Sequence, residues 1–431
     1  MLPTDTIVAV ATPPGTGGIA VVRVSGADAL PLVLRHLSVA TLSPRHATRC
    51  RFDDLDDGIA LFFPAGYTGE PTVEFSCHGS RYVQQAVVQT LVADGARLAE
   101  PGEYTMRAFR NGRLNLSQAE AVADLVDAVT PMQHRLAVSQ LRGGYAQRLK
   151  ELRQRLLDLT SLLELELDFS QEDVEFADRG ELGRLLAAID GQTTALIDSF
   201  AAGNALKQGV PVAIVGSPNV GKSTLLNALL QDDRAIVSPL PGTTRDTVEG
   251  MLTVDGITFR LVDTAGLRET DDAVERLGIE RSRRACDEAM VVLYMYDGTE
   301  PPMPSADGRG ILVLGKSDLA AATPPEGCTM PCVAVSALTG AGLDRLKRML
   351  VEAVSEQTAA EVLLCNVRHR DALVRVRQAL RQADRSLRDG VPADLVVVDL
   401  RDALYHLGTI TGEVTGDELL GNIFSRFCIG K

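Results

Sequence analysis

The feature that most constrains this chain is an eight-residue segment, Gly-Ser-Pro-Asn-Val-Gly-Lys-Ser, at residues 216–223. It matches the pattern G-x-x-x-x-G-K-[ST] between an apolar run at 211–215 and a helix-like run, and so predicts a strand, a phosphate-binding loop and a helix. Glycines let backbone N–H groups approach phosphates, Lys222 reaches the β- and γ-phosphates, and the Ser223 hydroxyl binds Mg²⁺. Short patterns also occur by chance, but the strand–loop–helix context favours a real phosphate site.

Four further motifs follow in order, and each is expected at the carboxyl end of a strand, the ligand edge of an α/β sheet. Residues 241–246 and 263–266 resemble GTPase switch segments, with Thr244 and Asp263 near the metal and the Gly266 amide at the γ-phosphate. Residues 315–318 offer Asp318 to guanine, and the 336–338 turn offers a backbone N–H to guanine O6. The expected GTP contacts are Asn219, Val220, Gly221, Lys222, Ser223, Thr224, Ser238, Pro239, Leu240, Pro241, Gly242, Thr243, Thr244, Asp263, Thr264, Ala265, Gly266, Lys316, Asp318, Ser336, Ala337 and Leu338.

Two positions depart from the usual GTPase pattern. Leu267 follows Asp-x-x-Gly, where Ras-type enzymes have the glutamine that orients the attacking water. Because an apolar side chain cannot do this, another residue must position the water. Gly315 stands where GTPases usually carry an asparagine that contacts the base and braces the phosphate loop, so guanine selectivity depends on Asp318 and the Ala337 amide.

The 431 residues are too many for one core, and their patterns change along the chain. Residues 1–116 alternate strands (6–11, 19–24, 59–63, 72–75) with helices (28–37, 81–93), which predicts an α+β domain. Residues 117–208 and 357–431 carry helical periodicity, starting from a capping box at Ser117 to Glu120 and including a last helix capped at 415–418. Buried parallel strands at 211–215, 259–262, 290–296, 311–314 and 332–335 predict an α/β P-loop domain over 209–356, inserted in an all-α domain whose two halves pack together.

Composition narrows the class of protein. Hydrophobic residues make up 45% and charged residues 23%, which excludes a disordered chain. The net charge of −14 argues against a generally basic nucleic-acid binder, although a local patch can still bind RNA. No apolar run approaches the roughly 20 residues of a membrane span, and the seven cysteines form no C-x-x-C pair. We therefore expect a cytoplasmic protein with reduced thiols.

Four motifs outside the nucleotide site point to one family. They are Ala-Thr-Pro-Pro-Gly at 11–15 with Arg-Val-Ser-Gly at 23–26, Pro-Gly-Glu-Tyr-Thr at 101–105 with Asn-Gly-Arg-Leu at 111–114, the segment 263–275, and Cys-Ile-Gly-Lys at 428–431. With these motifs the chain resembles the MnmE (TrmE) family of tRNA uridine-modifying GTPases over essentially its whole length.

The resemblance implies a homodimer whose N-terminal domains bind 5-formyl- or 5,10-methylene-tetrahydrofolate. With the FAD- and NADH-using partner MnmG, the family adds an aminomethyl or carboxymethylaminomethyl group to C5 of the wobble uridine of certain tRNAs. By motif position the folate contacts are Arg23, Glu74, Arg113 and Lys431. Without the family, Arg23 and Glu74 are interpreted as solvated strand partners, and Cys428 fits either a folate neighbour or a buried structural thiol.

For hydrolysis, the resemblance implies that G domains dimerise around K⁺, which offsets charge in place of an arginine finger. Glu275 matches the residue that positions water, the role that Leu267 cannot fill; its alternative is an exposed helix glutamate. The catalytic set is then Glu275, Lys222 and Thr244, with Mg²⁺ on Ser223 and Thr244 and K⁺ on Asn219, Ser238, Leu240 and Thr243.

The RNA surface is the least defined feature. Residues 366–390 hold seven arginines against three aspartates, a local charge of +4 that either follows phosphates or forms a solvated helix face. Two other functions compete: a ribosome-assembly GTPase of the Era or Der type, and a dimerisation scaffold with vestigial hydrolysis. Neither accounts for all four outlying motifs, so the MnmE-type function is favoured.

Overall fold

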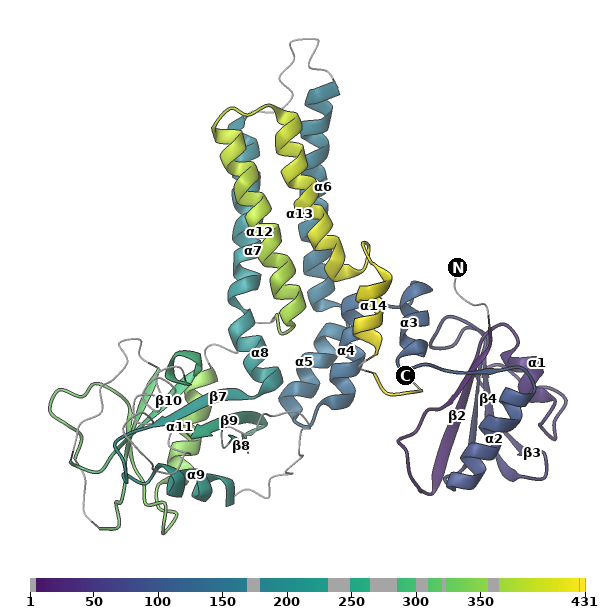
Figure 1. Ribbon diagram of the computed structural model, residues 1–431, viewed down its shortest axis with the longest axis horizontal. Coiled ribbons are helices and arrows are strands. Elements are labelled where there is room, and N and C mark those ends of the chain that lie inside the picture. The colour runs from purple at the N-terminus through teal and green to yellow at the C-terminus, as the bar shows by residue number, and fades with distance from the viewer. Residues whose placement is uncertain are drawn as a thin grey trace, which may run out of the picture. The chain divides into compact units, whose positions relative to one another are not determined.

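The computed structural model describes residues 5–168, 179–231, 249–263, 285–299, 309–319, 323–355, 364–425 and 427–430 (Figure 1). They form two compact units. The first contains Met1–Val126, Gln140–Glu151 and Leu404–Lys431, and the second contains Asp127–Ser139 and Leu152–Ala403. Among the described residues, no helix is long and apolar enough to cross a membrane.

The first unit is built on a six-stranded sheet of order β3-β4-β5-β2-β1-β6, antiparallel except for the parallel pair β1 and β6. Two helices, α1 and α2, pack on it and bury the apolar side chains of β2 and β5. The elements are β1 (Ile7–Val10), β2 (Ile19–Ser25), α1 (Ala29–Leu34), β3 (Thr48–Phe52), β4 (Asp56–Phe63), β5 (Thr72–His78), α2 (Arg81–Ala93) and β6 (Arg97–Leu98). The predicted α+β class is confirmed.

Details of this unit differ from the sequence prediction. The helix predicted over 28–37 ends at Leu34. Beyond it, the backbone N–H groups of His36 and Leu37 donate to carbonyls only three residues back, and Leu37 forms a β-bridge with Phe52. The strands β3 and β6 were not predicted. β3 alternates charged and buried residues around Cys50, and β6 has only two residues, so neither makes a strong apolar run.

Three short helices complete the first unit: α3 (Glu103–Arg110), α4 (Leu116–Asp127) and α14 (Asp417–Phe424). The predicted capping box at Ser117 and Glu120 is wrong. Asn115 Oδ1 accepts a bond from the Gln118 N–H at 2.8 Å while Gln118 Oε1 accepts from the Asn115 N–H at 3.0 Å, so the reciprocal cap lies two residues earlier. The N-cap of α14 is Gly416, which offers no side chain, and Phe427 lies beyond the end of this helix.

Helices also make up much of the second unit, and some of them extend into residues 140–151 and 404–411 of the first unit. They are α5 (Pro131–Leu141), α6 (Gly144–Asp168), α7 (Arg179–Asp198), α8 (Phe200–Gln208), α12 (Val367–Arg388) and α13 (Ala393–Thr411). Leucines spaced by three and four residues along α6 are buried, as the pattern predicts. α12 packs along α7, and Arg401 of α13 bonds to Glu164 of α6 at 2.7 Å, so helices from before and after the α/β segment pack together (Figure 1).

The α/β segment forms a second six-stranded sheet, of order β12-β11-β10-β7-β9-β8. Its elements are β7 (Val210–Val215), α9 (Lys222–Gln231), β8 (Glu249–Val254), β9 (Ile257–Asp263), β10 (Val291–Tyr296), β11 (Gly310–Leu314), β12 (Cys332–Ala334) and α11 (Leu343–Ser355). Five strands are parallel, as predicted, and β8 adds an antiparallel edge. β7 lies between β10 and β9, so the segment that follows it leaves the middle of the sheet.

Candidate functional site

The loop at 216–221 joins the carboxyl end of β7 to the first turn of α9. Gly216 has a φ of 156°, and a Cβ there would lie only 2.7 Å from the Met295 carbonyl oxygen of the neighbouring strand. Asn219 has a φ of 62°, in the left-handed region that asparagine tolerates, and its side chain is exposed. The glycine and the asparagine therefore let this loop turn tightly beside the sheet.

Lys222 is the first residue of α9, and its side chain reaches back to the loop. Its buried Nζ donates to the Gly216 carbonyl at 2.7 Å and to the Ser217 carbonyl at 2.9 Å. Ser223 and Thr224 follow in the first turn of α9, where both are exposed and where helix N–H groups attract anions. A cationic amine and a helix N-terminus at the end of a central parallel strand form a phosphate-binding arrangement.

The base-side motif follows β11. Lys316 has a φ of 56°, and its Nζ lies 2.9 Å from Asp297 Oδ2, after the end of the adjacent strand β10. The hydrogen bond from Lys316, with another from Thr299, lowers the pKa of Asp297 to about 2. Asp318 is exposed two residues further on. Lys316 thus fixes the turn that presents Asp318.

Gly315 is buried between the two loops. A Cβ at this position would lie 3.5 Å from the Val220 carbonyl oxygen and 3.5 Å from Met295 Cε, which are ordinary contacts. The backbone of Gly315 does not adopt a positive φ. The site therefore has room for a larger side chain at residue 315. Because glycine has no side chain, no side-chain contact at this residue connects the phosphate loop to the base turn.

The last motif turns tightly after β12. The Ser336 side chain is buried, its hydroxyl accepts from the Thr339 N–H at 3.2 Å, and its own N–H donates to the Ala341 carbonyl at 2.9 Å. These bonds shape the turn and leave Leu338 exposed, while Ala337 packs against the domain core. Ser336 therefore supports the turn rather than facing solvent.

Several predicted positions lie outside the described residues, and their roles stay predictions. They are Ser238, Pro239, Leu240, Pro241, Gly242, Thr243, Thr244, Thr264, Ala265, Gly266, Leu267, Glu275 and Lys431. Asp263 ends β9 at the expected edge of the sheet, but only its backbone is described.

In the first unit, Arg23 and Glu74 face each other on β2 and β5. Arg23 Nε lies 2.8 Å from Glu74 Oε1, and Arg23 Nη1 donates to the Gly430 carbonyl at 3.3 Å. Both side chains are half-buried. Arg23 and Glu74 are therefore strand partners that are partly shielded from solvent. Through Arg23 they also hold the segment around residue 430 against the sheet.

Two tyrosines around Arg23 were not predicted. The Arg23 guanidinium carbon lies 6.0 Å from the ring centre of Tyr67 and 5.6 Å from that of Tyr104, whose hydroxyl donates to the Arg23 carbonyl at 2.7 Å. Burial raises the pKa of both phenols. The Tyr104 signal was present in the Pro-Gly-Glu-Tyr-Thr motif, whereas Tyr67 lies in a loop without periodicity. Arg113 borders the same loop, next to Gly69.

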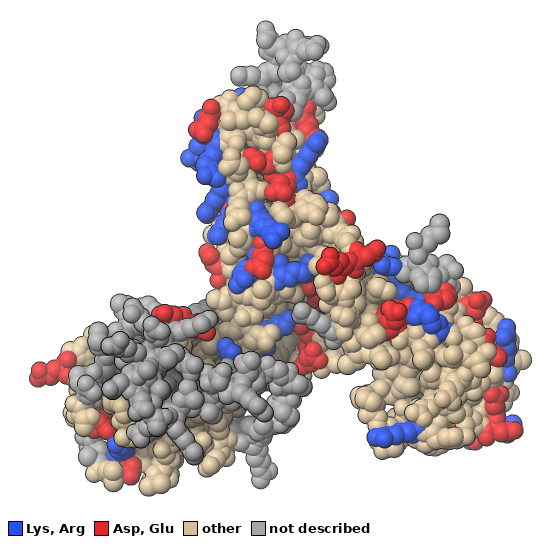
Figure 2. Space-filling view, in the orientation of Figure 1, with Lys and Arg blue, Asp and Glu red and all other residues tan. Residues whose placement is uncertain are grey.

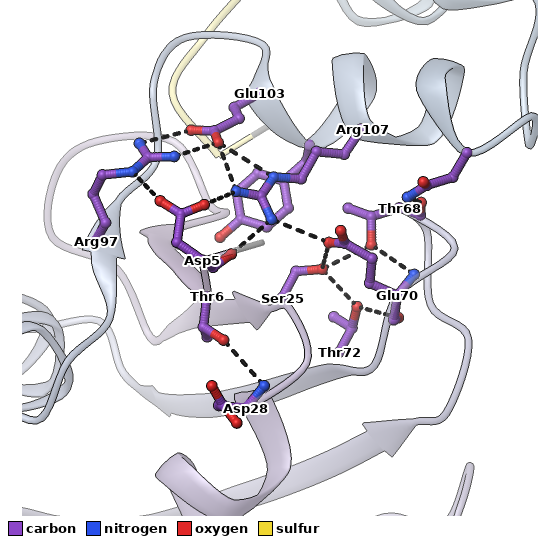
Figure 3. Close-up of polar contacts among 12 residues, drawn as sticks. Asp5, Thr6, Ser25, Asp28, Thr68, Glu70, Thr72, Arg97, Glu103 and Arg107 are labelled. Atoms are coloured by element: carbon purple, nitrogen blue, oxygen red, sulfur yellow. Dashed lines mark hydrogen bonds and ion pairs between the residues drawn. The ribbon is translucent and has the colours of Figure 1, made fainter. Parts of the chain in front are cut away.

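A buried ion-pair network supports this region (Figure 3). Arg107 of α3 is only 2% exposed and pairs with Asp5 at 2.8 Å, Glu103 at 2.9 Å and Glu70 at 3.3 Å. Arg97 of β6 pairs with the same Glu103 at 2.6 Å. Each buried charge thus has opposite charges around it, which a stable buried network requires. The network ties α3, and with it Tyr104, to the sheet.

Cys428 is exposed, which excludes the alternative of a buried structural thiol; its position near the folate stays a prediction. Its backbone carbonyl accepts from the Gly102 N–H at 3.5 Å, and Gly102 has a φ of 69°. A Cβ on Gly102 would meet the Phe424 carbonyl oxygen at 2.6 Å. Backbone packing therefore holds this segment and leaves the thiol accessible.

A phosphate-binding loop after the central strand, with a base turn two strands away, defines a P-loop GTPase joined to an α+β domain and a helical domain. The family profile described as MnmE helical domain matches residues 116–428, and that described as GTP-binding protein TrmE N-terminus matches residues 6–113. The tRNA modification GTPase MnmE of Parabacteroides distasonis is 45% identical over 462 residues, covering 99% of this chain and 100% of that protein. The chain belongs to the MnmE family of tRNA modification GTPases.

Other relatives agree. The protein of the same name from Porphyromonas gingivalis is 46% identical over 466 residues, covering 99% of this chain and 98% of that protein. Among solved structures, the G domain of the T. maritima FeoB iron transporter is 27% identical, covering 34% of this chain and 98% of that chain at a TM-score of 0.26. The family assignment rests on the sequence relatives.

Proposed function

We propose that this chain is a K⁺-activated GTPase that acts with MnmG to add an aminomethyl or carboxymethylaminomethyl group to C5 of the wobble uridine of certain tRNAs. The added carbon comes from a tetrahydrofolate, and dimerisation of the G domains drives GTP hydrolysis. The observation that carries this proposal is the phosphate-binding loop, which joins the buried Lys222 to the exposed Asn219 within an MnmE-family chain.

The loop residues fit the proposed ions in chemical type. Mg²⁺ takes oxygen ligands, and the exposed Ser223 hydroxyl supplies one, with Thr244 proposed as the second. Asn219 supplies an amide oxygen for K⁺, and Ser238, Leu240 and Thr243 are the remaining proposed ligands. A second cation beside the phosphates offsets the charge that develops on the leaving oxygen. Lys222 then holds the β- and γ-phosphates, and Glu275 orients the attacking water.

The Arg23 region fits a one-carbon folate. A pterin ring is flat, stacks on aromatic rings and forms paired hydrogen bonds with a carboxylate, and the exposed Tyr67 and the half-buried Glu74 supply these groups. Tyr104 is fully buried and supports Arg23 from within the domain. Arg113 and Lys431 would add positive charge for the folate carboxylates. Bound there, the cofactor supplies the one-carbon unit, while Arg23 and Glu74 orient it.

Exposed apolar side chains support association of the N-terminal domains. Ile19 is 71% exposed and Tyr82 is 72% exposed, and a bond from the Gly17 N–H to the Gly79 carbonyl joins the segments that precede them. Large apolar groups gathered in one region of a surface favour a protein contact. We propose that this contact is the homodimer, with MnmG and tRNA as the further partners.

Hydrolysis in K⁺ and in Na⁺ at matched ionic strength tests the GTPase part of the proposal. K⁺ should raise the rate at least about tenfold, and Asn219→Ala should remove the difference, since a positioned charge contributes on this scale. Asn227→Ala, an exposed asparagine later in α9, is the matched control and should keep the K⁺ response. Equal rates in both salts would refute K⁺ activation.

Folate binding separates the MnmE-type function from a ribosome-assembly GTPase. The full chain should bind 5-formyl-tetrahydrofolate in calorimetry, and Arg23→Ala should weaken that binding by tenfold or more, the order of one charge-assisted hydrogen bond. Absence of folate binding by the full chain would favour the ribosome-assembly alternative.

A further inference from the structure

The strongest unassigned feature is the positive charge that α12 carries. Among residues 366–390 the net charge is +4, in a chain whose total is −14. The overall charge repels a polyanion, so an RNA must contact this chain where cations gather locally. Blue side chains run along the edge of the helical bundle where Figure 1 places α7 and α12 (Figure 2).

The arginines of α12 form a line. An α-helix turns by about 100° per residue, so Arg370, Arg377, Arg381 and Arg388 lie within about 40° of one another around the helix axis. At about 1.5 Å per residue they extend over about 27 Å, with gaps of about 6 to 10 Å. The buried apolar residues of α12 lie to one side of these arginines, with Leu373 about 60° and Val376 about 120° away around the axis. Arg370 and Arg377 are therefore half-buried, while Arg381 and Arg388 are exposed. We call these four arginines the α12 arginine line.

The surroundings of the line leave positive charge available. Arg381 is 57% exposed and lies 3.6 Å from Asp190 of α7, and Arg388 is 74% exposed and lies 2.8 Å from Asp384. Such exposed pairs are weak, and each arginine keeps further N–H donors for a phosphate. Arg370 lies 2.7 Å from Asp371, whereas Arg377 has no carboxylate partner among the described residues. Counting the three acids, the four arginines still carry a net charge of +1.

A second basic segment at 142–155 has a different geometry. It holds Arg142, Arg148, Lys150, Arg153 and Arg155 against Glu151, also +4. On α6, Arg148 and Arg155 lie about 20° apart around the axis, but Lys150 lies about 160° from Arg148, so the helix cations divide into pairs on different sides. Equal net charge therefore does not make an equal surface, because α12 brings four arginines to one side.

We propose that the α12 arginine line is the surface on which this protein holds the phosphate backbone of its RNA substrate. The inference rests on the proposed tRNA function and adds the site of contact. The gap of about 6 Å between Arg377 and Arg381 allows contacts with neighbouring phosphates of one RNA strand, and the two gaps of about 10 Å allow contacts with phosphates further along it. Each guanidinium group can donate two hydrogen bonds to the oxygens of one phosphate. Contacts of this kind position an RNA without reading its bases.

The test is the salt dependence of tRNA binding by the full chain. The variant Arg377→Gln/Arg381→Gln/Arg388→Gln should bind a tRNA transcript roughly tenfold or more weakly, with a log–log salt slope reduced by about 2 to 3, since each phosphate contact contributes about 0.7 to 0.9. The triple lysine variant at the same positions should keep most of the binding, because a phosphate accepts a point charge. GTP hydrolysis should be unchanged in both.

The matched control is Arg148→Gln/Lys150→Gln/Arg155→Gln on α6, which removes the same charge from exposed positions of another helix. If this variant loses binding and the α12 variant does not, the proposal is wrong. It is equally wrong if the α12 variant binds tRNA like the wild type but no longer modifies it with MnmG, because the line would then contact a protein. A wild-type chain that binds no tRNA would instead refute the proposed function itself.

Discussion

Restoring an asparagine at Gly315 should tighten guanine-nucleotide binding. The Cβ of the new residue would lie 3.5 Å from the Val220 carbonyl oxygen, and the backbone does not need a positive φ. From that Cβ an amide N–H can reach the Val220 carbonyl of the phosphate loop, and the same side chain can contact the bound base. One or two hydrogen bonds stabilise by roughly 1–3 kcal/mol, which is about 5- to 150-fold in Kd.

Calorimetry of GDP binding measures this effect, and Gly315→Ala is the matched control. Alanine supplies the same Cβ, and by restricting the unfolded chain it raises the free energy of unfolding by about 0.4–1 kcal/mol. It adds no hydrogen-bond donor. The asparagine variant should therefore bind GDP more tightly than both the wild type and the alanine variant. If asparagine and alanine give the same affinity, the bridging hydrogen bond does not form and the reasoning fails.

Further predictions concern catalysis and stability. Glu275→Ala should slow single-turnover hydrolysis in K⁺ by about 100-fold or more, with GDP affinity nearly unchanged, because the glutamate acts mainly in the transition state; a wild-type rate would refute its role. Arg107→Leu should lower the free energy of unfolding of the first unit by about 3–5 kcal/mol in urea denaturation, because it leaves buried carboxylates unpaired; a loss below 1 kcal/mol would contradict this. Hydrogen bonds from Arg97 and Arg107 hold the pKa of Asp5 below its usual value, and those bonds outweigh burial to lower the pKa of Glu103. The stabilisation from these two carboxylates is complete above the pKa that they have in the unfolded chain, and it is lost as pH falls through their lower pKa in the folded protein. The free energy of unfolding should therefore drop below about pH 5, and it should drop less steeply in Arg107→Leu.

The parallel sheet and its phosphate loop could be predicted because their signals are local. An apolar run, a glycine-rich turn and a lysine within 13 residues specify a strand, a loop and a helix start. The ion-pair network around Arg107 could not be predicted, since Asp5 and Arg107 are 102 residues apart and each is interpreted alone as a surface charge. The cap at Asn115 was missed because Ser117 offers the same pattern two residues later. Tyr67 joins the Arg23 site only through the fold of its loop.

The bond between Arg23 and the Gly430 carbonyl joins residues 407 positions apart. Ribosomes add about 5–20 residues per second, so residue 430 is made roughly 20 to 80 s after residue 23. During that interval the α+β domain can emerge and fold, but its arginine has no Gly430 carbonyl to bind. A chain broken off before residue 430 lacks the same contact however well its first domain has folded. The contact between Arg23 and the Gly430 carbonyl can therefore form only after all the intervening domains have been translated.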